Sequence, residues 1–166
     1  MPRPPRSLWR ISNHADLTGR GALRAGARWH SKGREVVYCA EAPTGALLEA
    51  LVQLEVESLD ELPRSYQLLR IAFPAKAAVE EVALDALPAD WKQRTLLTRS
   101  VGDTWLAAGR SVALCVPSAV APHAFNVLLN PRLLAGTGIR IVAKSRHPFD
   151  TRLFKTVRAV PGRRRR

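Results

Sequence analysis

The stretch "EVVYCAEAPTGALLEALVQLEV", residues 35–56, decides the fold. Its first part, residues 35–41, is rich in β-branched and aromatic side chains, which is typical of a largely buried strand. Its second part, residues 42–56, carries leucines at helical spacing, and Thr44 is positioned to cap a helix there. The stretch therefore predicts a strand, a turn and a helix in direct succession.

The rest of the chain predicts more strands than helices. One or two helices are expected within residues 87–110, with Asp103 capping a short helix around Trp105. Further strands are expected at residues 8–11, 65–74, 78–84, 111–118, 124–131 and 139–149. Because strands and helices do not alternate regularly, we expect an α+β fold with a mixed β-sheet core and flanking helices, and not a doubly wound parallel sheet.

The bulk composition fits one folded domain. A chain of 166 residues buries enough surface for a single core, and we expect one domain over residues 1–155, followed by a disordered basic tail over residues 156–166. The formal net charge is +12, and four of these charges belong to the terminal run of arginines. Such a field attracts nucleic acid, a phosphorylated small molecule or an acidic protein, and charge alone does not choose between them.

The cysteines and histidines indicate the cellular compartment of the protein and whether it has a metal site. Cys39 and Cys115 each lie in a short apolar run and are expected to be buried and reduced, which favours a cytoplasmic protein. Residues 1–13 lack the apolar stretch of a secretory signal, and no window resembles a membrane span. The four histidines are scattered without the close spacing of zinc ligands, so no metal site is predicted.

Three residues near the decisive stretch are candidates for chemistry. Glu49 lies opposite the predicted leucine stripe of its helix, where either a solvated surface residue or a catalytic carboxylate is possible. Arg28, in a glycine-containing loop, is either one more surface cation or part of an anion site. Tyr38 lies in the middle of a strand, where an aromatic ring is usually part of the core and its hydroxyl then needs a partner.

Two further candidates follow predicted strands. Ser118 precedes His123 by five residues, which raises the possibility of a serine hydrolase, but the G-x-S-x-G elbow is absent and no acid partner can be identified. Asn126 and Asn130 lie four residues apart and belong either to turns and strand edges or to a pocket.

Several separated segments together resemble the RES domain family. These segments, in chain order, are "GARWHSKGREVVYCAEAPTGALLEAL", "GDTWL", "VPSAV", "NVLLNP" and "FDTRLF". The family is named for an Arg, a Glu and a Ser, which here match Arg28, Glu49 and Ser118. The resemblance implies a fold similar to that of ADP-ribosyltransferase toxins and the toxin role in a type II toxin–antitoxin pair that degrades NAD+.

The resemblance also implies roles for the candidate residues. Arg28 would hold the NAD+ pyrophosphate, Tyr38 would pack on the nicotinamide or its ribose, and Glu49 would be the catalytic carboxylate. Ser118 and Asn126 would line the same pocket. NAD+ would be the substrate, in a glycohydrolase or phosphorylase reaction, and no true cofactor is expected.

The partners that the resemblance implies are an Xre-type antitoxin, DNA only indirectly through that antitoxin, and a second copy of the toxin as a homodimer within the toxin–antitoxin complex. No membrane partner is expected. Two alternatives stay open: a mono-ADP-ribosyltransferase that modifies a protein, and a non-catalytic basic module that binds nucleic acid or an acidic partner.

Overall fold

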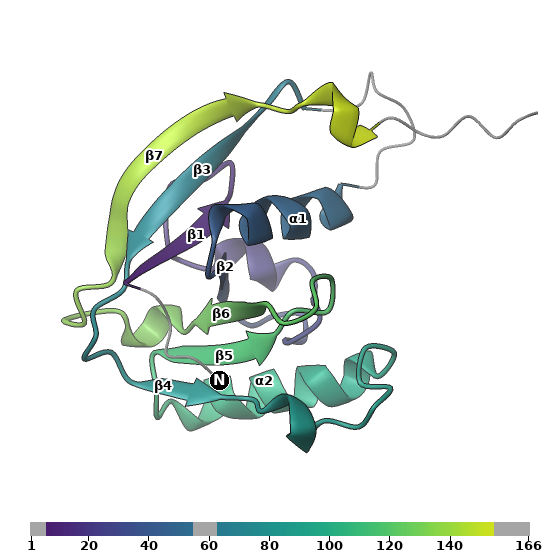
Figure 1. Ribbon diagram of the computed structural model, residues 1–166. Coiled ribbons are helices and arrows are strands. Elements are labelled where there is room, and N and C mark those ends of the chain that lie inside the picture. The colour runs from purple at the N-terminus through teal and green to yellow at the C-terminus, as the bar shows by residue number, and fades with distance from the viewer. Residues whose placement is uncertain (1–5, 55–62, 155–166) are drawn as a thin grey trace, which may run out of the picture.

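Seven strands form one mixed sheet in the computed structural model, which describes residues 6–54 and 63–154 (Figure 1). The strands are β1 (Ser7–Ile11), β2 (Val37–Ala40), β3 (Ser65–Ala72), β4 (Val79–Glu81), β5 (Ala113–Pro117), β6 (Phe125–Leu129) and β7 (Arg140–Pro148). Their order across the sheet is β4-β5-β6-β2-β1-β3-β7, with β4 parallel to β5 and the other neighbours antiparallel. The prediction of an α+β fold with a mixed sheet is confirmed.

Two α-helices accompany the sheet in the described part of the chain. They are α1 (Pro43–Gln53) and α2 (Thr95–Ala108). Short 3-10 turns occur at Arg20–Leu23, Leu84–Ala86, Pro131–Leu133 and Thr151–Phe154. Each predicted strand is present within a few residues of its expected bounds, and residues 87–110, where one or two helices were expected, contain one α-helix. The predicted basic tail, residues 156–166, lies outside the described residues.

Both helices pack on the same face of the sheet. Trp105 of α2 packs in a buried cluster with Leu114 and Leu128 of the central strands. Glu49 of α1 reaches Asn126, which shares a face with Leu128 because side chains alternate along β6. The opposite face carries a second cluster that includes Val37, Cys39, Cys115, Val127 and Leu129, and the two cysteines are buried free thiols, as predicted.

The start of α1 differs from the prediction. Ala42, and not Thr44, occupies the N-cap position, and Pro43 is the first helical residue. Proline suits this position because its fixed φ matches the helix and its missing N–H would have no partner in the first turn. The helix ends at Gln53 with Leu54 as its C-cap, and residues 55 and 56 of the predicted helix lie outside the described part of the chain.

The predicted leucine stripe of α1 is also wrong. Leu48 is 38% exposed, whereas Ala46 is 6% exposed and is the buried residue of the helix. The small alanines allow the helix to lie close to β1 and β2 (Figure 1). The face that was expected to be solvated, which includes Glu49, therefore turns toward the sheet.

Candidate active site

Glu49 is held by two side chains from distant parts of the chain. Its Oε1 accepts a hydrogen bond of 3.0 Å from Ser118 Oγ, in the loop after β5, and one of 2.7 Å from Asn126 Nδ2 on β6. Both donors engage the same carboxylate oxygen, so the contacts within the described residues leave Oε2 available to a ligand. The structure thus brings together three of the residues that were singled out in the sequence.

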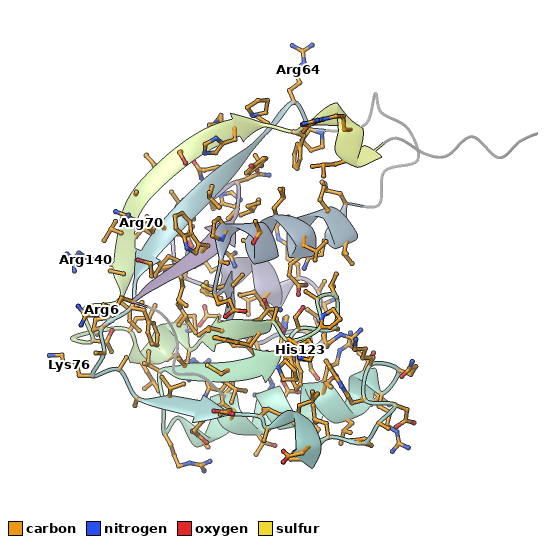
Figure 2. The ribbon with its side chains drawn as sticks, viewed as in Figure 1. Arg6, Arg64, Arg70, Lys76, His123 and Arg140 are labelled. Carbon is orange, nitrogen blue, oxygen red and sulfur yellow. The ribbon has the colours of Figure 1, made fainter. Side chains whose placement is uncertain are left out.

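Ser118 fixes the carboxylate and is itself fixed by a turn. Its hydroxyl oxygen accepts hydrogen bonds from the backbone N–H groups of Val120 and Ala121, at 3.2 and 3.1 Å. Its hydroxyl proton goes to Glu49, while His123 is exposed in the same loop (Figure 2). This geometry argues against the serine hydrolase alternative, because the Ser118 hydroxyl donates to a carboxylate and not to a histidine base.

Glu49 and Asn126 open onto a cavity of about 580 Å³, a size within the range of roughly 300–1,000 Å³ of small-molecule sites. Arg28 and Tyr38 line the same cavity, together with a second arginine, Arg10. Apart from Glu49, the charged side chains among the described residues of its lining are arginines, so this cavity suits a ligand with anionic groups and one centre that develops positive charge.

Arg28 lies at the α2 side of this cavity. Its Nη1 donates a hydrogen bond of 2.7 Å to the carbonyl oxygen of Lys92, and its guanidinium lies 5.9 Å from the ring centre of Trp91. These contacts hold the side chain at the rim, where several of its donors remain for an anion.

The Tyr38 hydroxyl is part of a buried hydrogen-bond chain. It accepts a bond of 3.2 Å from the backbone N–H of Trp29 and lies 2.8 Å from Nδ1 of His30. Since Nε2 of His30 lies 3.2 Å from the carbonyl oxygen of Ala22, which can only accept, we assign the imidazole proton to Nε2 and the donor role to Tyr38. Burial raises the pKa of Tyr38 well above its usual value, so the hydroxyl stays protonated and Tyr38 offers the cavity mainly its ring.

Arg10 is the site residue that the sequence reasoning missed. It lies on β1, its Nη1 donates a 3.0 Å hydrogen bond to the carbonyl oxygen of Tyr38, and it lines the cavity. Its Nε is buried and has no hydrogen-bond partner among the described residues. A buried donor without a partner is costly unless a ligand or water satisfies it. The signal for Arg10 in the sequence was a cation within the short and otherwise apolar strand predicted at residues 8–11.

One wall of the cavity is held in place by α2 through main-chain contacts. Thr98 Oγ1 donates a hydrogen bond of 2.6 Å to the carbonyl oxygen of Arg28, and Arg99 Nε donates one of 2.8 Å to that of Ala27. Gly102 lies so close to this segment that a Cβ at its position would overlap the carbonyl oxygen of Trp29. The helix and the wall therefore form one packed unit.

Asp103 was predicted to cap a helix, and this prediction is wrong. Its carboxylate adds to the contact between α2 and the cavity wall. Asp103 lies in the second half of α2, where its Oδ1 accepts a hydrogen bond of 3.0 Å from Ser31 N and forms a salt bridge of 3.0 Å with Arg34 Nε. Partial burial opposes ionisation, but the contacts with Ser31 and Arg34 outweigh it and lower the pKa of Asp103. The carboxylate serves a long-range contact because the helix begins at Thr95, eight residues before it.

The described residues hold neither a metal-ligating cluster nor a membrane-spanning helix. Within residues 6–54 and 63–154, no group of three or more His, Cys, Asp or Glu side chains is arranged to hold a metal ion. No helix in that part of the chain is both long and apolar enough to cross a membrane.

The model of the RES domain family matches residues 7–151. The chain belongs to the RES domain family. It is 43% identical over 147 residues to the protein named Toxin Res of Pseudomonas putida, a match that covers 89% of this chain and 99% of that protein. It is 31% identical over 159 residues to the Prs ADP-ribosylating toxin of a Sphingobium species, covering 90% of this chain and 97% of that toxin.

A solved structure shares the fold of this RES domain. A chain in the crystal structure of the M. tuberculosis MbcT-MbcA toxin-antitoxin complex superposes with a TM-score of 0.68 at 18% sequence identity. The match covers 86% of this chain and 84% of the other. The family resemblance that rested on five separated motifs is thus confirmed, and Glu49, Ser118 and Asn126, which come from three of those motifs, meet in one site.

Proposed function

We propose that this RES protein is the toxin of a toxin–antitoxin pair and that it cleaves the bond between nicotinamide and ribose in NAD+. The observation that carries the proposal is a carboxylate, Glu49, that is oriented by two neutral donors and opens onto a cavity lined by Arg10 and Arg28. The names of the relatives from Pseudomonas and Sphingobium support the toxin role.

The chemistry of the reaction fits this set of side chains. When the bond to nicotinamide breaks, positive charge develops on the ribose, and a fixed carboxylate next to it stabilises that charge. Nicotinamide leaves as a neutral molecule because its ring nitrogen already carries positive charge, so no acid is needed to protonate it. Glu49 faces the ribose in this proposal, the ring of Tyr38 packs on the nicotinamide, and Arg10 and Arg28 hold the pyrophosphate.

The test is the release of nicotinamide from NAD+ by the purified protein. Glu49→Gln keeps the shape of the side chain and the hydrogen bond with Ser118 but removes the charge, so we expect kcat to fall by roughly 10²–10³-fold, the loss typical of one electrostatic group. The matched control is Glu35→Gln, which removes the same charge at a residue whose carboxylate pairs with Arg132. Turnover by Glu49→Gln at the rate of this control would contradict the role of Glu49.

A second candidate function is mono-ADP-ribosylation of a protein, which the name of the Sphingobium relative favours. Both reactions release nicotinamide, and they differ in what then bonds to the ribose. Labelled NAD+ incubated with the protein and a cell extract distinguishes them, because only the transferase reaction leaves the label on a protein.

An antitoxin is the partner that this function requires. The chain that shares the fold comes from a toxin–antitoxin complex, and an Xre-type antitoxin that covers the large cavity would keep the toxin inactive. Contact with DNA would then run through the antitoxin.

A further inference from the structure

A second and smaller cavity, of about 180 Å³, adjoins Glu49. Glu49 and Asn126 are the two described residues that line both cavities, so the carboxylate that the proposed reaction uses borders both spaces. The walls of the small cavity come from the turn before α1, from α1 itself and from the loop between β5 and β6. A molecule in it would reach Glu49 without entering the large cavity.

The two cavities differ in charge. The large cavity has Arg10 and Arg28 in its lining, whereas no Lys, Arg or His occurs among the described residues that line the small one. The small cavity instead contains two carboxylates, Glu41 and Glu49, and the neutral polar groups of Thr44, Ser118 and Asn126. An anion placed there would be repelled by both carboxylates, with no cation of the lining to compensate.

Glu41 is fixed in a position to act on a molecule in this cavity. It directly follows β2, is half-buried, and its Oε1 accepts a 3.2 Å hydrogen bond from the backbone N–H of Phe125. This bond uses one carboxylate oxygen and orients the side chain against β6. The second oxygen can then accept a proton or a hydrogen bond from a small neutral molecule.

We propose that the small cavity is the site of the acceptor, that the acceptor is water, and that Glu41 is the base that activates it. This inference rests on the proposed cleavage of NAD+. The bond between the anomeric carbon and nicotinamide breaks, and its electron pair stays on the ring nitrogen. The water oxygen bonds to the anomeric carbon and its proton passes to Glu41 and then to solvent, so the products are ADP-ribose, neutral nicotinamide and one proton. Orthophosphate, an anion, is excluded.

The first experiment measures which acceptor is used. The full-length protein is incubated with NAD+ alone, with added orthophosphate, and with added methanol, a small neutral competitor of water, and the products are resolved by chromatography. We expect ADP-ribose in all three samples, methyl ADP-ribose only with methanol, and no phosphorylated ADP-ribose with orthophosphate. Phosphorylated ADP-ribose as the main product would overturn the acceptor assignment while leaving NAD+ cleavage intact. Absence of nicotinamide release would instead refute the proposed function itself.

The second experiment changes Glu41. Glu41→Gln keeps an oxygen for the Phe125 N–H, and we expect kcat for hydrolysis to fall by roughly 10²-fold, as for loss of a general base, with little change in KM for NAD+. Glu41→Lys supplies a cation, and we expect phosphorylated ADP-ribose to appear with orthophosphate. Asp85→Lys, the same charge change at an exposed residue, is the control and should leave the product ratio unchanged. A Glu41→Gln protein with wild-type kcat and product ratio would overturn the role of Glu41.

Discussion

The hydroxyl of Tyr38 has mainly a structural role and contributes little to contact with a ligand. It links the backbone of Trp29 to the ring of His30, and both of these residues are 2% exposed. A ligand in the cavity therefore meets an aromatic face whose orientation is set by two polar contacts behind it. The family resemblance assigns different kinds of role to Tyr38 and Glu49. Tyr38 offers a ligand the face of its ring, and Glu49 offers it a negative charge.

Tyr38→Phe tests this distinction. The change leaves the Trp29 N–H and His30 Nδ1 buried without their partner, so we expect the free energy of unfolding to drop by about 1–3 kcal/mol, the usual cost of such groups. The ring is retained, so KM for NAD+ should stay nearly constant at a temperature where the variant is folded. Urea denaturation and nicotinamide release measure the two quantities.

Tyr66→Phe is the matched control for Tyr38→Phe. Tyr66 is the other tyrosine of the chain, and its ring packs between His147 and Phe149, outside the cavity. We expect its change to alter stability by no more than about 0.5 kcal/mol. A Tyr38→Phe protein with unchanged stability but a strongly raised KM would mean that the hydroxyl contacts the substrate.

At the scale of elements, helix α2 supports the cavity wall, and Gly102 allows the helix to lie close to that wall. Gly102→Ala places a methyl group against the carbonyl oxygen of Trp29 and forces the helix and the wall apart. We expect a loss of stability of roughly 1–3 kcal/mol or more, as for overpacking in a core, together with a fall in nicotinamide release. Gly21→Ala adds the same group where no atom lies within 4 Å, and it should change the unfolding midpoint little. Equal unfolding midpoints for the two variants would contradict this account of α2.

The elements themselves could be predicted from the sequence because they depend on local patterns. The β-branched run at residues 35–41 predicts β2, and the helical spacing of the leucines with Thr44 as a cap predicts α1 within a few residues. The face of α1 could not be predicted, because the leucines were expected to be the core while packing against β1 and β2 favours the small Ala46. Asp103 illustrates the same limit, since its partners Ser31 and Arg34 lie about 70 residues away along the chain.

The candidate site also depends on contacts between residues that lie far apart in the sequence. Ser118 and Asn126 are 69 and 77 residues from Glu49 in sequence, and only motif resemblance linked them before the fold was known. Arg10 belonged to no motif that was recognised, and its role follows from pairing of β1 beside β2, which brings its guanidinium to the backbone of Tyr38. The small cavity and Glu41 could not be derived from any local pattern.

At the scale of the whole molecule, positive charge is spread well beyond the site. Arg6, Arg70, Lys76 and Arg140 lie together at the curved end of the sheet, away from α1 (Figure 2). Strand pairing agrees with the view: Arg140 is opposite Ala72, and Phe73 bonds to the backbone of Arg6. None of the four lines either cavity, so this group of positive charges is separate from Arg10 and Arg28 of the site.

This separation makes a prediction for the double variant Arg70→Gln, Arg140→Gln. Because the two side chains are exposed and line neither cavity, we expect kcat and KM for NAD+ to stay within about twofold of the wild-type values, as for surface changes outside a site. A non-catalytic basic module would instead lose salt-sensitive binding to DNA or RNA in this variant. Filter binding and nicotinamide release on the same preparations decide between the two, and loss of turnover would contradict the separation of charge and site.

The contacts between α2 and residues 27–31 have a consequence for which substitutions such a protein can accept in evolution. The helix holds this segment by its peptide groups, namely two carbonyl oxygens, one N–H and a close approach at Trp29. At Ala27, Arg28 and Ser31 these bonds go to the main chain, so they do not depend on which side chains the three residues carry, whereas the Trp29 side chain packs in the same buried cluster as Trp105 of α2. Substitutions at these three positions can therefore change ligand preference while the architecture beneath them stays the same.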